Sequence, residues 1–368
     1  MLAVRNACEA DLGAVLALAA DAGPGMTTLK PDRDALAARL ALAAASFAGE
    51  VAPQDADYLF VLEDLASGRI GGVSAIKAAV GVNEPFYNYR LSTSVHTSPA
   101  TGLVNRVCSL HLTHDLSGAS ELCSLYLHPA YRGGGGGRLL SKSRLLFLAQ
   151  FPDLFAAKVF AEMRGFLDDA GRSPFWESVG RPFFRMDFHE ADDLCGRGER
   201  QFIEQLVPRL PLYTHLLGEA ARAAIGRTHA DTVPARRLLE QEGLQFDGYV
   251  DIFDGGPVLE AKLPALRAVR ESGLHVAAPA GPDGAAAGAP AGAPGRTTRC
   301  LVATTRRERF RVVVADVDPA AAVVRLGRPL LDALEGEPGI PLRVLPLDPR
   351  PGTADPRAGA RGLCVDPQ

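Results

Sequence analysis

The chain has 368 residues, enough for two or three domains, and its charge is balanced: 39 lysines and arginines face 43 aspartates and glutamates, for a net charge of −4. This balance excludes a broad basic surface for nucleic acid. The six cysteines show no CxxC pair and no metal-ligand spacing, so we expect reduced thiols and no metal site. No apolar run reaches the length that spans a membrane.

The N-terminus resembles a signal peptide only superficially. Arg5, Glu9 and Asp11 interrupt its apolar residues, and the residues that follow repeat with the spacing of an amphipathic helix. We therefore expect a soluble, cytoplasmic protein that begins with a strand over 1–7 and a helix from Asp11 to about Ala20.

The next elements form a hairpin preceded by a helix. An alanine- and leucine-rich helix is predicted from residue 33 to about 47. Residues 58–64 have the apolar character of a buried strand, and a Ser-Gly-Arg turn at 67–69 leads into a second strand over 70–76. The predicted order is therefore strand, helix, helix, strand, strand.

An insertion that is both aromatic and polar follows at 81–115 and carries Tyr89 and Arg90. Two interpretations are open from the sequence. The insertion forms one wall of a substrate pocket, or it is an edge hairpin with exposed tyrosines.

Residues 121–149 combine a strand, a glycine loop and a helix. The apolar run 122–127 ends at His128-Pro129, since proline supplies no backbone N–H. Arg132 and five glycines follow, and then leucines near helical spacing. This arrangement directs free backbone N–H groups and the positive end of a helix at a bound anion.

The spacing of this loop separates it from two other anion-binding loops. A P-loop needs Lys-Ser/Thr after its last glycine, whereas Arg138 follows here. A dinucleotide fingerprint lies near the start of a βαβ unit, and no such unit is evident. The remaining pattern, Arg-x-x-Gly-x-Gly at Arg132, Gly135 and Gly137, resembles the pyrophosphate loop of the GNAT acyl-CoA N-acyltransferases. The alternative is a flexible turn.

Two later segments share one plan. Ser173-Pro174 begins a predicted helix through Gly180, and an aromatic strand is predicted over 183–188. A helix opening at Thr232 and an aromatic strand over 249–253 repeat that plan. The repetition suggests a second, degenerate GNAT-like half packed on the first.

These elements divide the chain into five parts. We predict a GNAT domain over 1–190, a second half over 191–275, an Ala/Pro/Gly linker over 276–297, a small β-rich subdomain over 298–350 and a disordered tail over 351–368.

Nine stretches resemble the arginine N-succinyltransferase family. They are YLFVLED (58–64), AVGVNEPFYNYR (79–90), SELCSLYLHPAYR (120–132), LLSKSRLLFLA (139–149), VFAEMRG (159–165), SPFWESVGR (173–181), MDFHEADDLCG (186–196), IGRTHADT (225–232) and YVDIFDGGP (249–257). The third and sixth are more similar to the β-subunit type. Pro24 and Met26 depart from the family's pattern.

The resemblance implies an α+β GNAT fold, with a mixed and mostly antiparallel sheet, flanking helices and a C-terminal all-β part. It implies transfer of succinyl from the cosubstrate succinyl-CoA to the α-amino group of L-arginine, the first step of the arginine succinyltransferase degradation pathway, without a permanently bound cofactor. His229 of the GxxHxxT segment is implied as proton donor and Leu125 as a succinyl-CoA contact. A homo-oligomer, or pairing with a sister subunit, is also implied.

Acyl transfer to an amine needs three things. The α-ammonium must lose a proton, the thioester oxygen needs a donor as it becomes an oxyanion, and the leaving thiolate benefits from a proton. A backbone N–H beside Leu125 is the predicted oxyanion donor, and His229 is predicted to protonate the thiolate. Glu121 and Glu162, or water held by them, are candidates for the amine proton. Without the resemblance to this family, we would interpret His229 as a loop histidine that hydrogen-bonds Thr232 or the start of the next helix.

The substrates carry charges that require partners. Arg90 is a candidate for the succinyl carboxylate by bidentate geometry. Asp115, Asp251 and Asp254 are candidates for the guanidinium of arginine.

Three further residues of the central segment have open roles. Lys142 and Arg144 either face CoA or lie on a solvated helix face. Cys123 suggests an acyl-cysteine intermediate, but a buried cysteine in an apolar strand is usually inert, so direct attack is the simpler expectation. Other functions left open are an acyltransferase for ornithine or another basic amino acid, and a non-catalytic partner subunit.

Overall fold

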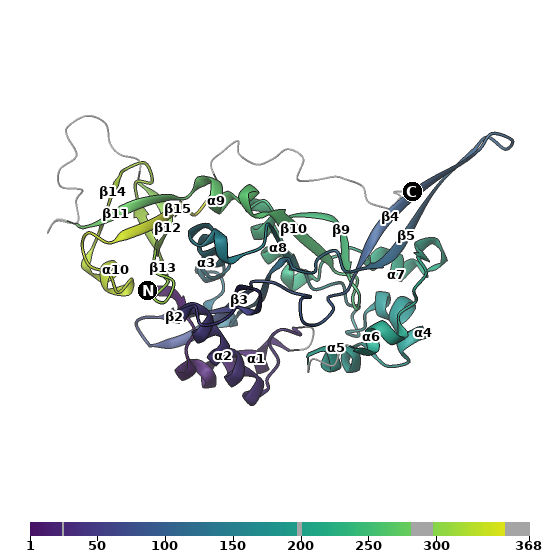
Figure 1. Cartoon of the computed structure of the whole chain (residues 1–368), viewed down its shortest axis with the longest axis horizontal. Helices are drawn as coiled ribbons and strands as arrows, with labels where there is room; N and C mark the ends of the chain where they lie inside the picture. The colour runs from purple at the N-terminus through teal and green to yellow at the C-terminus, as the bar shows by residue number, and fades with distance from the viewer. Residues whose placement is uncertain (24–25, 197–200, 281–296, 350–368) are drawn as a thin grey trace.

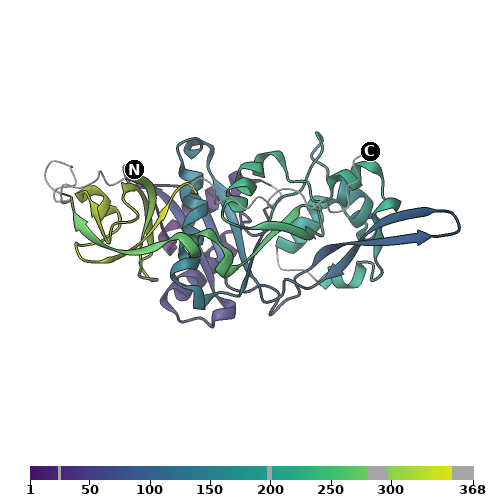
Figure 2. The ribbon, with the colours of Figure 1, turned by 90° about the horizontal axis from the view of Figure 1, so that it is seen from above.

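A computed structural model describes residues 1–23, 26–196, 201–280 and 297–349 (Figure 1). The molecule is elongated, with the C-terminal strands at one end and the hairpin β4–β5 at the other (Figures 1 and 2). Within the described ranges, no helix has the length and apolar character that a membrane crossing requires.

One sheet runs along the whole molecule. Its 15 strands in the described residues lie in the order β14-β11-β15-β12-β13-β1-β2-β3-β6-β7-β10-β9-β4-β5-β8. In chain order these strands are β1 Leu2–Asn6, β2 Asp57–Asp64, β3 Arg69–Lys77, β4 Asn88–Ser98, β5 Leu103–Thr113, β6 Ser120–Leu127, β7 Lys158–Glu162, β8 Leu212–Tyr213, β9 Gln245–Asp251, β10 Pro257–Lys262, β11 Gly273–Pro279, β12 Thr298–Thr304, β13 Arg311–Val317, β14 Val323–Leu326 and β15 Pro341–Pro346. Pairing is antiparallel except for β6 with β7 and β11 with β14.

Ten α-helices in the described residues accompany this sheet. They are α1 Leu12–Ala22, α2 Arg33–Ala48, α3 Gly136–Gln150, α4 Arg181–Phe184, α5 Phe188–Gly196, α6 Gln201–Leu206, α7 Glu219–Ala224, α8 Val233–Gln241, α9 Arg267–Glu271 and α10 Arg328–Ala333. Helices α1 and α2 lie on one side of β2 and β3, and α3 lies on the other (Figure 1). Helices α4 to α7 gather near the base of the β4–β5 hairpin (Figure 1).

The predicted order of the first elements is confirmed, from β1 through α1, α2, β2 and β3 to β6 and α3. Local sequence explains the ends of α2, since Asp32 accepts the backbone N–H groups of Asp34 and Ala35 and Gly49 adopts φ 81°. Packing explains the position of α3. The ring centroid of Phe147 lies 5.0 Å from that of Tyr58 in β2 and 4.9 Å from that of Phe310.

The C-terminal strands extend the same sheet, because β13 pairs with β1 through Ala3 and Val313. The predicted linker over 276–297 is wrong at its start, since β11 continues to Pro279 and pairs with both β14 and β15. Residues 281–296 of that linker and the predicted tail over 351–368 lie outside the described residues.

The predicted strand over 183–188 is wrong. Residues up to Phe184 belong to α4, and α5 begins at Phe188. The ring of Phe184 stacks on Trp176 with centroids 5.2 Å apart, so these aromatic residues surround a buried tryptophan. The first copy of the suggested repeat therefore has no strand, and the division into two GNAT-like halves stays a prediction.

The insertion over 81–115 contains the β4–β5 hairpin, whose far half projects from the body (Figures 1 and 2). The expectation of exposed tyrosines is wrong, because Tyr87 and Tyr89 at its base are only 7% and 3% exposed. Asn88 pairs with Asp251 of β9, and this pairing fixes the base of the hairpin to the sheet.

Candidate active site

The parallel strands β6 and β7 pair only at their start. Ser120 faces Val159 and Glu121 faces Phe160, and in the described residues no pairing between the two strands follows. On its other side β7 stays paired with β10 as far as Glu162. Backbone groups along the facing edges of β6 and β7 are therefore left to pair with something else, and the widening gap suits an extended ligand.

A β-bulge at Ser124 turns the chain of β6 at this gap. The register with β3 shifts there, and Ser124 has φ 52°, in the left-handed region that non-glycine residues rarely adopt. Two arginines hold the bulge. Arg39 of α2 donates from Nη1 to Ser124 Oγ at 2.9 Å, and Arg144 of α3 donates from Nη1 to the Cys123 carbonyl at 3.2 Å. The bulge thus sets the direction of the next residue, Leu125.

The glycine loop after β6 is open. Gly133 and Gly135 both have φ 86°, a conformation that glycine adopts without strain. A Cβ built on Gly133, Gly134 or Gly135 would meet no atom within 4 Å. Helix α3 begins at Gly136, so the N–H groups of its first turn lie at this opening without helical partners. Arg132 is exposed beside them, with Nε 3.1 Å from the Leu127 carbonyl.

His229 lies beside the end of β7. Its backbone N–H donates to the Arg164 carbonyl at 2.8 Å, and Thr228 forms a bridge with Gly165. Burial lowers the pKa of His229, and the charge of Arg164 lowers it further. The imidazole is therefore mostly neutral at neutral pH. Because Nδ1 accepts the Asp231 N–H at 3.2 Å, the hydrogen of the neutral ring is on Nε2.

The strand register places Leu125 and His229 on opposite sides of the same gap. Leu125 comes four residues after Glu121, and Arg164 comes four residues after Phe160, which faces Glu121. Leu125 and Arg164 are therefore at similar levels along the two diverging strands, apart from the offset of the bulge. His229 is hydrogen-bonded to Arg164 and shares this level.

A pair of aspartates supports the His229 side of the gap. Asp254 is buried and accepts the N–H groups of Gly165 at 2.6 Å and Gly256 at 2.8 Å. Asp251 accepts the N–H groups of Phe253 and Asp254 on a single oxygen, Oδ1, at 2.7 and 2.9 Å. Burial raises the pKa of Asp251 well above its ordinary value, with repulsion by Asp254 adding to the shift. The raised pKa favours the protonated form of Asp251, which can donate to the Asp254 carboxylate.

Asp251→Asn is expected to stabilise the protein increasingly as pH rises. A carboxyl whose folded pKa is raised binds more protons folded than unfolded, so its contribution to stability is lost as pH rises from the unfolded value through the folded one. Asparagine keeps the acceptor Oδ1 and supplies a permanent donor to Asp254. Urea unfolding at pH 5 and pH 8 should show a larger gain for the variant at pH 8. An equal or smaller gain at pH 8 contradicts the raised pKa of Asp251.

The two candidate bases lie on the two diverging strands. Glu121 is the last residue of β6 that pairs with β7, and it is 4% exposed. Glu162 ends β7 and accepts from Asn88 Nδ2 at 2.8 Å. Both residues therefore lie on the strands that border the gap in the sheet.

The structure does not bring Arg90 to this gap. Arg90 is in β4, four strands away from β6 in the sheet order. Its guanidinium lies 4.2 Å from the ring centroid of Tyr249, and Nη2 lies 3.9 Å from Asp247. Asp115 is also bound to Tyr249, accepting from the phenol at 2.8 Å. These two residues form a cluster on the outer strands.

Lys142 and Arg144 neither face CoA nor lie on a solvated face, so both alternatives are wrong. Their exposures are 0% and 1%. Lys142 forms an ion pair with Glu242 at 2.8 Å, and Arg144 holds the Cys123 carbonyl. Burial raises the pKa of Cys123 to about 11, so its thiol is protonated and a poor nucleophile.

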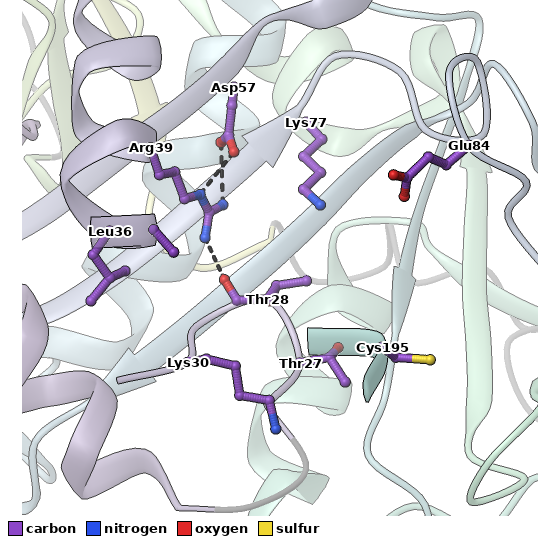
Figure 3. A pocket seen from close by; sticks show the side chains of 10 residues that line it. Thr27, Thr28, Lys30, Leu36, Arg39, Asp57, Lys77, Glu84 and Cys195 are labelled. Atoms are coloured by element: carbon purple, nitrogen blue, oxygen red, sulfur yellow. Dashed lines mark hydrogen bonds and ion pairs between the residues drawn. The ribbon is translucent and has the colours of Figure 1, made fainter. Parts of the chain in front are cut away.

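A pocket of about 290 Å³ adjoins the bulge, and the sequence did not predict it (Figure 3). It is lined by Thr27, Thr28, Lys30, Ala35, Leu36, Arg39, Asp57, Lys77, Glu84 and Cys195. Arg39 connects the pocket with the bulge and also binds Asp57, from Nε at 2.8 Å and Nη2 at 3.2 Å. Glu84 is in the aromatic insertion, which thus contributes to a pocket. The spacing of the sequence motifs gave no signal for Arg39 or Lys77, because their neighbours come from distant segments.

Comparison with known proteins decides the family. A family model described as arginine N-succinyltransferase beta subunit matches residues 2–268. The chain belongs to this family. Arginine N-succinyltransferases of Salmonella paratyphi B and Salmonella typhimurium are each 44% identical to it over 347 residues, 94% of this chain and 98% of theirs.

A solved structure agrees with the arginine N-succinyltransferase family assignment. The arginine/ornithine succinyltransferase subunit AI from Pseudomonas aeruginosa is 35% identical, covers 95% of this chain and 99% of its own length, and superposes with a TM-score of 0.83. The predicted GNAT fold and the expected similarity to the β-subunit type are confirmed. The chain is an acyltransferase of this family.

Proposed function

We propose that the protein transfers the succinyl group of succinyl-CoA to the α-amino group of L-arginine, giving N2-succinyl-L-arginine and CoA. This is the first step of the arginine succinyltransferase degradation pathway. The observation that carries the proposal is the gap between β6 and β7, which leads from an open glycine loop past Leu125 to His229. The choice of succinyl as the acyl group and of arginine as the acceptor rests on membership of the arginine N-succinyltransferase family.

CoA is proposed to enter along β6. Its diphosphate binds the N–H groups of the glycine loop and of the first turn of α3, with Arg132, Gly135 and Gly137 contributing. Its pantetheine arm pairs with the free edge of β6, and the thioester lies at Leu125. The backbone N–H beside the Ser124 bulge then donates to the oxyanion.

Direct attack on the thioester needs three proton movements. The α-ammonium loses a proton to Glu121 or Glu162, or to water that they hold. The amine nitrogen then bonds to the carbonyl carbon and loses its second proton, which we assign to His229, and the C–S bond breaks. We assign His229 as the donor to the departing sulfur: the imidazolium that forms when the ring takes up the proton from the amine nitrogen passes a proton to the thiolate and returns to the neutral ring.

A second acceptor is ornithine, favoured by the similarity to the arginine/ornithine succinyltransferase subunit AI. The protein is proposed to act in the cytoplasm, as a homo-oligomer or with a sister subunit.

Asp251 and Asp254 are engaged with each other and with backbone N–H groups, which favours a supporting role for them over binding of the guanidinium.

Thiol release from succinyl-CoA with a panel of amino acids tests the proposal. Release with arginine supports it, and release with ornithine alone supports the second acceptor. No release with any acceptor, from a protein that binds CoA by calorimetry, points to a non-catalytic subunit. Absence of CoA binding as well removes the enzyme assignment. Sizing of the purified chain addresses its assembly.

A further inference from the structure

Lys77 lines the pocket beside the bulge and points into it (Figure 3). It is the last residue of β3, and in the sheet it lies between Asp57 of β2 and Glu121 of β6. Its side chain is half-buried. A cation in such a place needs an anion or water to offset its lost hydration.

The other two cations of the pocket have partners. Lys30 Nζ lies 2.6 Å from an oxygen of Asp192, and Arg39 binds Asp57 through two nitrogens. The side chain of Lys77 forms no hydrogen bond or ion pair with any residue in the described part of the chain, and neither does that of Glu84 at the exposed rim of the pocket. The ammonium of Lys77 is thus available to an anion.

The pocket continues the path proposed for CoA. That path runs back along β6 from the glycine loop to Leu125, and Arg39 joins the pocket to Ser124, the residue before it. Lys77 pairs with Glu121, four residues before Leu125, roughly 13 Å at about 3.3 Å per residue. A four-carbon acyl group and an extended lysine side chain together cover that distance.

Building on the proposed function, we propose that Lys77 binds the terminal carboxylate of the succinyl group. The carboxylate of arginine is a poorer match, because it is attached to the carbon that carries the attacking nitrogen and so stays beside the thioester. The ion pair selects a dicarboxylic acyl group over a neutral one of equal length, since a neutral group leaves the lysine without its partner.

The test compares two acyl donors, succinyl-CoA and butyryl-CoA, in steady-state kinetics with arginine. The wild type is expected to prefer succinyl-CoA. Lys77→Met is expected to lose about 10- to 100-fold in kcat/KM for succinyl-CoA and to change by less than about twofold for butyryl-CoA. Lys77→Arg should keep most of the preference.

Lys262→Met, the same change at an exposed position of β10, is the control and should leave both donors unaffected. Equal loss on both donors, or no loss on either, overturns the proposal. A loss that vanishes when agmatine, which lacks the carboxylate, replaces arginine assigns Lys77 to the acceptor and also overturns it.

Calorimetry separates this proposal from the proposed function. If the wild type shows no turnover, its affinities for succinyl-CoA and butyryl-CoA still report on Lys77. Tighter binding of succinyl-CoA that disappears in Lys77→Met supports the carboxylate site without reference to the acceptor. Equal affinities in both proteins overturn it.

Discussion

Glu242→Gln is expected to lower the free energy of unfolding by about 3–5 kcal/mol, the usual cost of removing one partner of a buried ion pair. Glu242 is fully buried, and its Oε1 lies 2.8 Å from Lys142 Nζ and 2.7 Å from Arg267 Nη2. Glutamine keeps the shape but removes the charge, so Lys142 loses its counterion and Arg267 keeps only Glu271, at 3.4 Å. The pKa of Lys142 is already lowered by burial even with Glu242 present, which shows how little other compensation there is.

The position of this cluster explains why its loss affects the whole molecule. Lys142 is in α3, Glu242 follows α8, and Arg267 is in α9. Lys142 also donates to the Leu347 carbonyl at 2.8 Å and Arg267 to the Pro346 carbonyl at 3.0 Å, at the end of β15. The cluster therefore joins the helix behind the glycine loop to the His229 segment and to the C-terminal strands.

Urea unfolding of Glu240→Gln provides the matched control. Glu240 is in α8 and pairs with Arg236 four residues earlier, at 2.8 Å, in a partly exposed ion pair. Such pairs contribute about 0.3–0.5 kcal/mol. A loss at Glu242 no larger than that at Glu240 contradicts the assigned role of the cluster.

The same cluster marks a limit of sequence reasoning. Lys142 and Arg144 follow the glycine loop on a helix, where charged residues usually face solvent or a ligand. Their burial depends on Glu242, a hundred residues later, and on the Cys123 carbonyl, which is turned by the bulge. Neither partner is evident from local periodicity.

Elements defined by local patterns were predicted well, and elements defined by tertiary contacts were not. The strands 58–64 and 70–76 have continuous apolar runs closed by a glycine turn, and the structure places β2 and β3 there. Residues 183–188 carry aromatic side chains that suit a strand, but contact with Trp176 makes them helix and turn. β11 was missed because its alanines merge with the Ala/Pro/Gly run, although pairing with β14 and β15 makes it a strand.

The residues of the candidate site also fall into those set by local sequence and those set by tertiary contacts. The glycine loop and the strand before it are local in sequence, so Gly135, Gly137 and the Leu125 segment could be predicted. His229 was proposed as a site residue through the resemblance to the family alone. The reason for its placement, a hydrogen bond to the Arg164 carbonyl beside the gap, joins residues 65 positions apart. Lys77 and Arg39 have no sequence signal, because their pocket forms only when α2 packs on β2 and distant segments meet there.

His229→Asn is expected to lower kcat by about 10²- to 10⁴-fold, the range for loss of a general acid or base, with little change in the affinity for CoA. Asparagine is the informative replacement because it can still accept the Asp231 N–H at the start of the turn, as Nδ1 does now at 3.2 Å. The backbone bond from residue 229 to Arg164 is also kept. A loss of turnover in this variant therefore reflects the imidazole and not the fold.

Changing the leaving group of the acyl donor distinguishes a chemical role of His229 from a purely positional one. A succinyl thiophenyl ester releases a more acidic thiol, which leaves without a proton. If His229 protonates the departing sulfur, the deficit of His229→Asn relative to wild type shrinks with this donor. A deficit of the same size with both donors contradicts the role of proton donor, and unchanged turnover with succinyl-CoA removes His229 from the reaction. His215→Ala, at an exposed position, controls for loss of a histidine elsewhere and should retain full activity, since His215 lies outside the gap between β6 and β7.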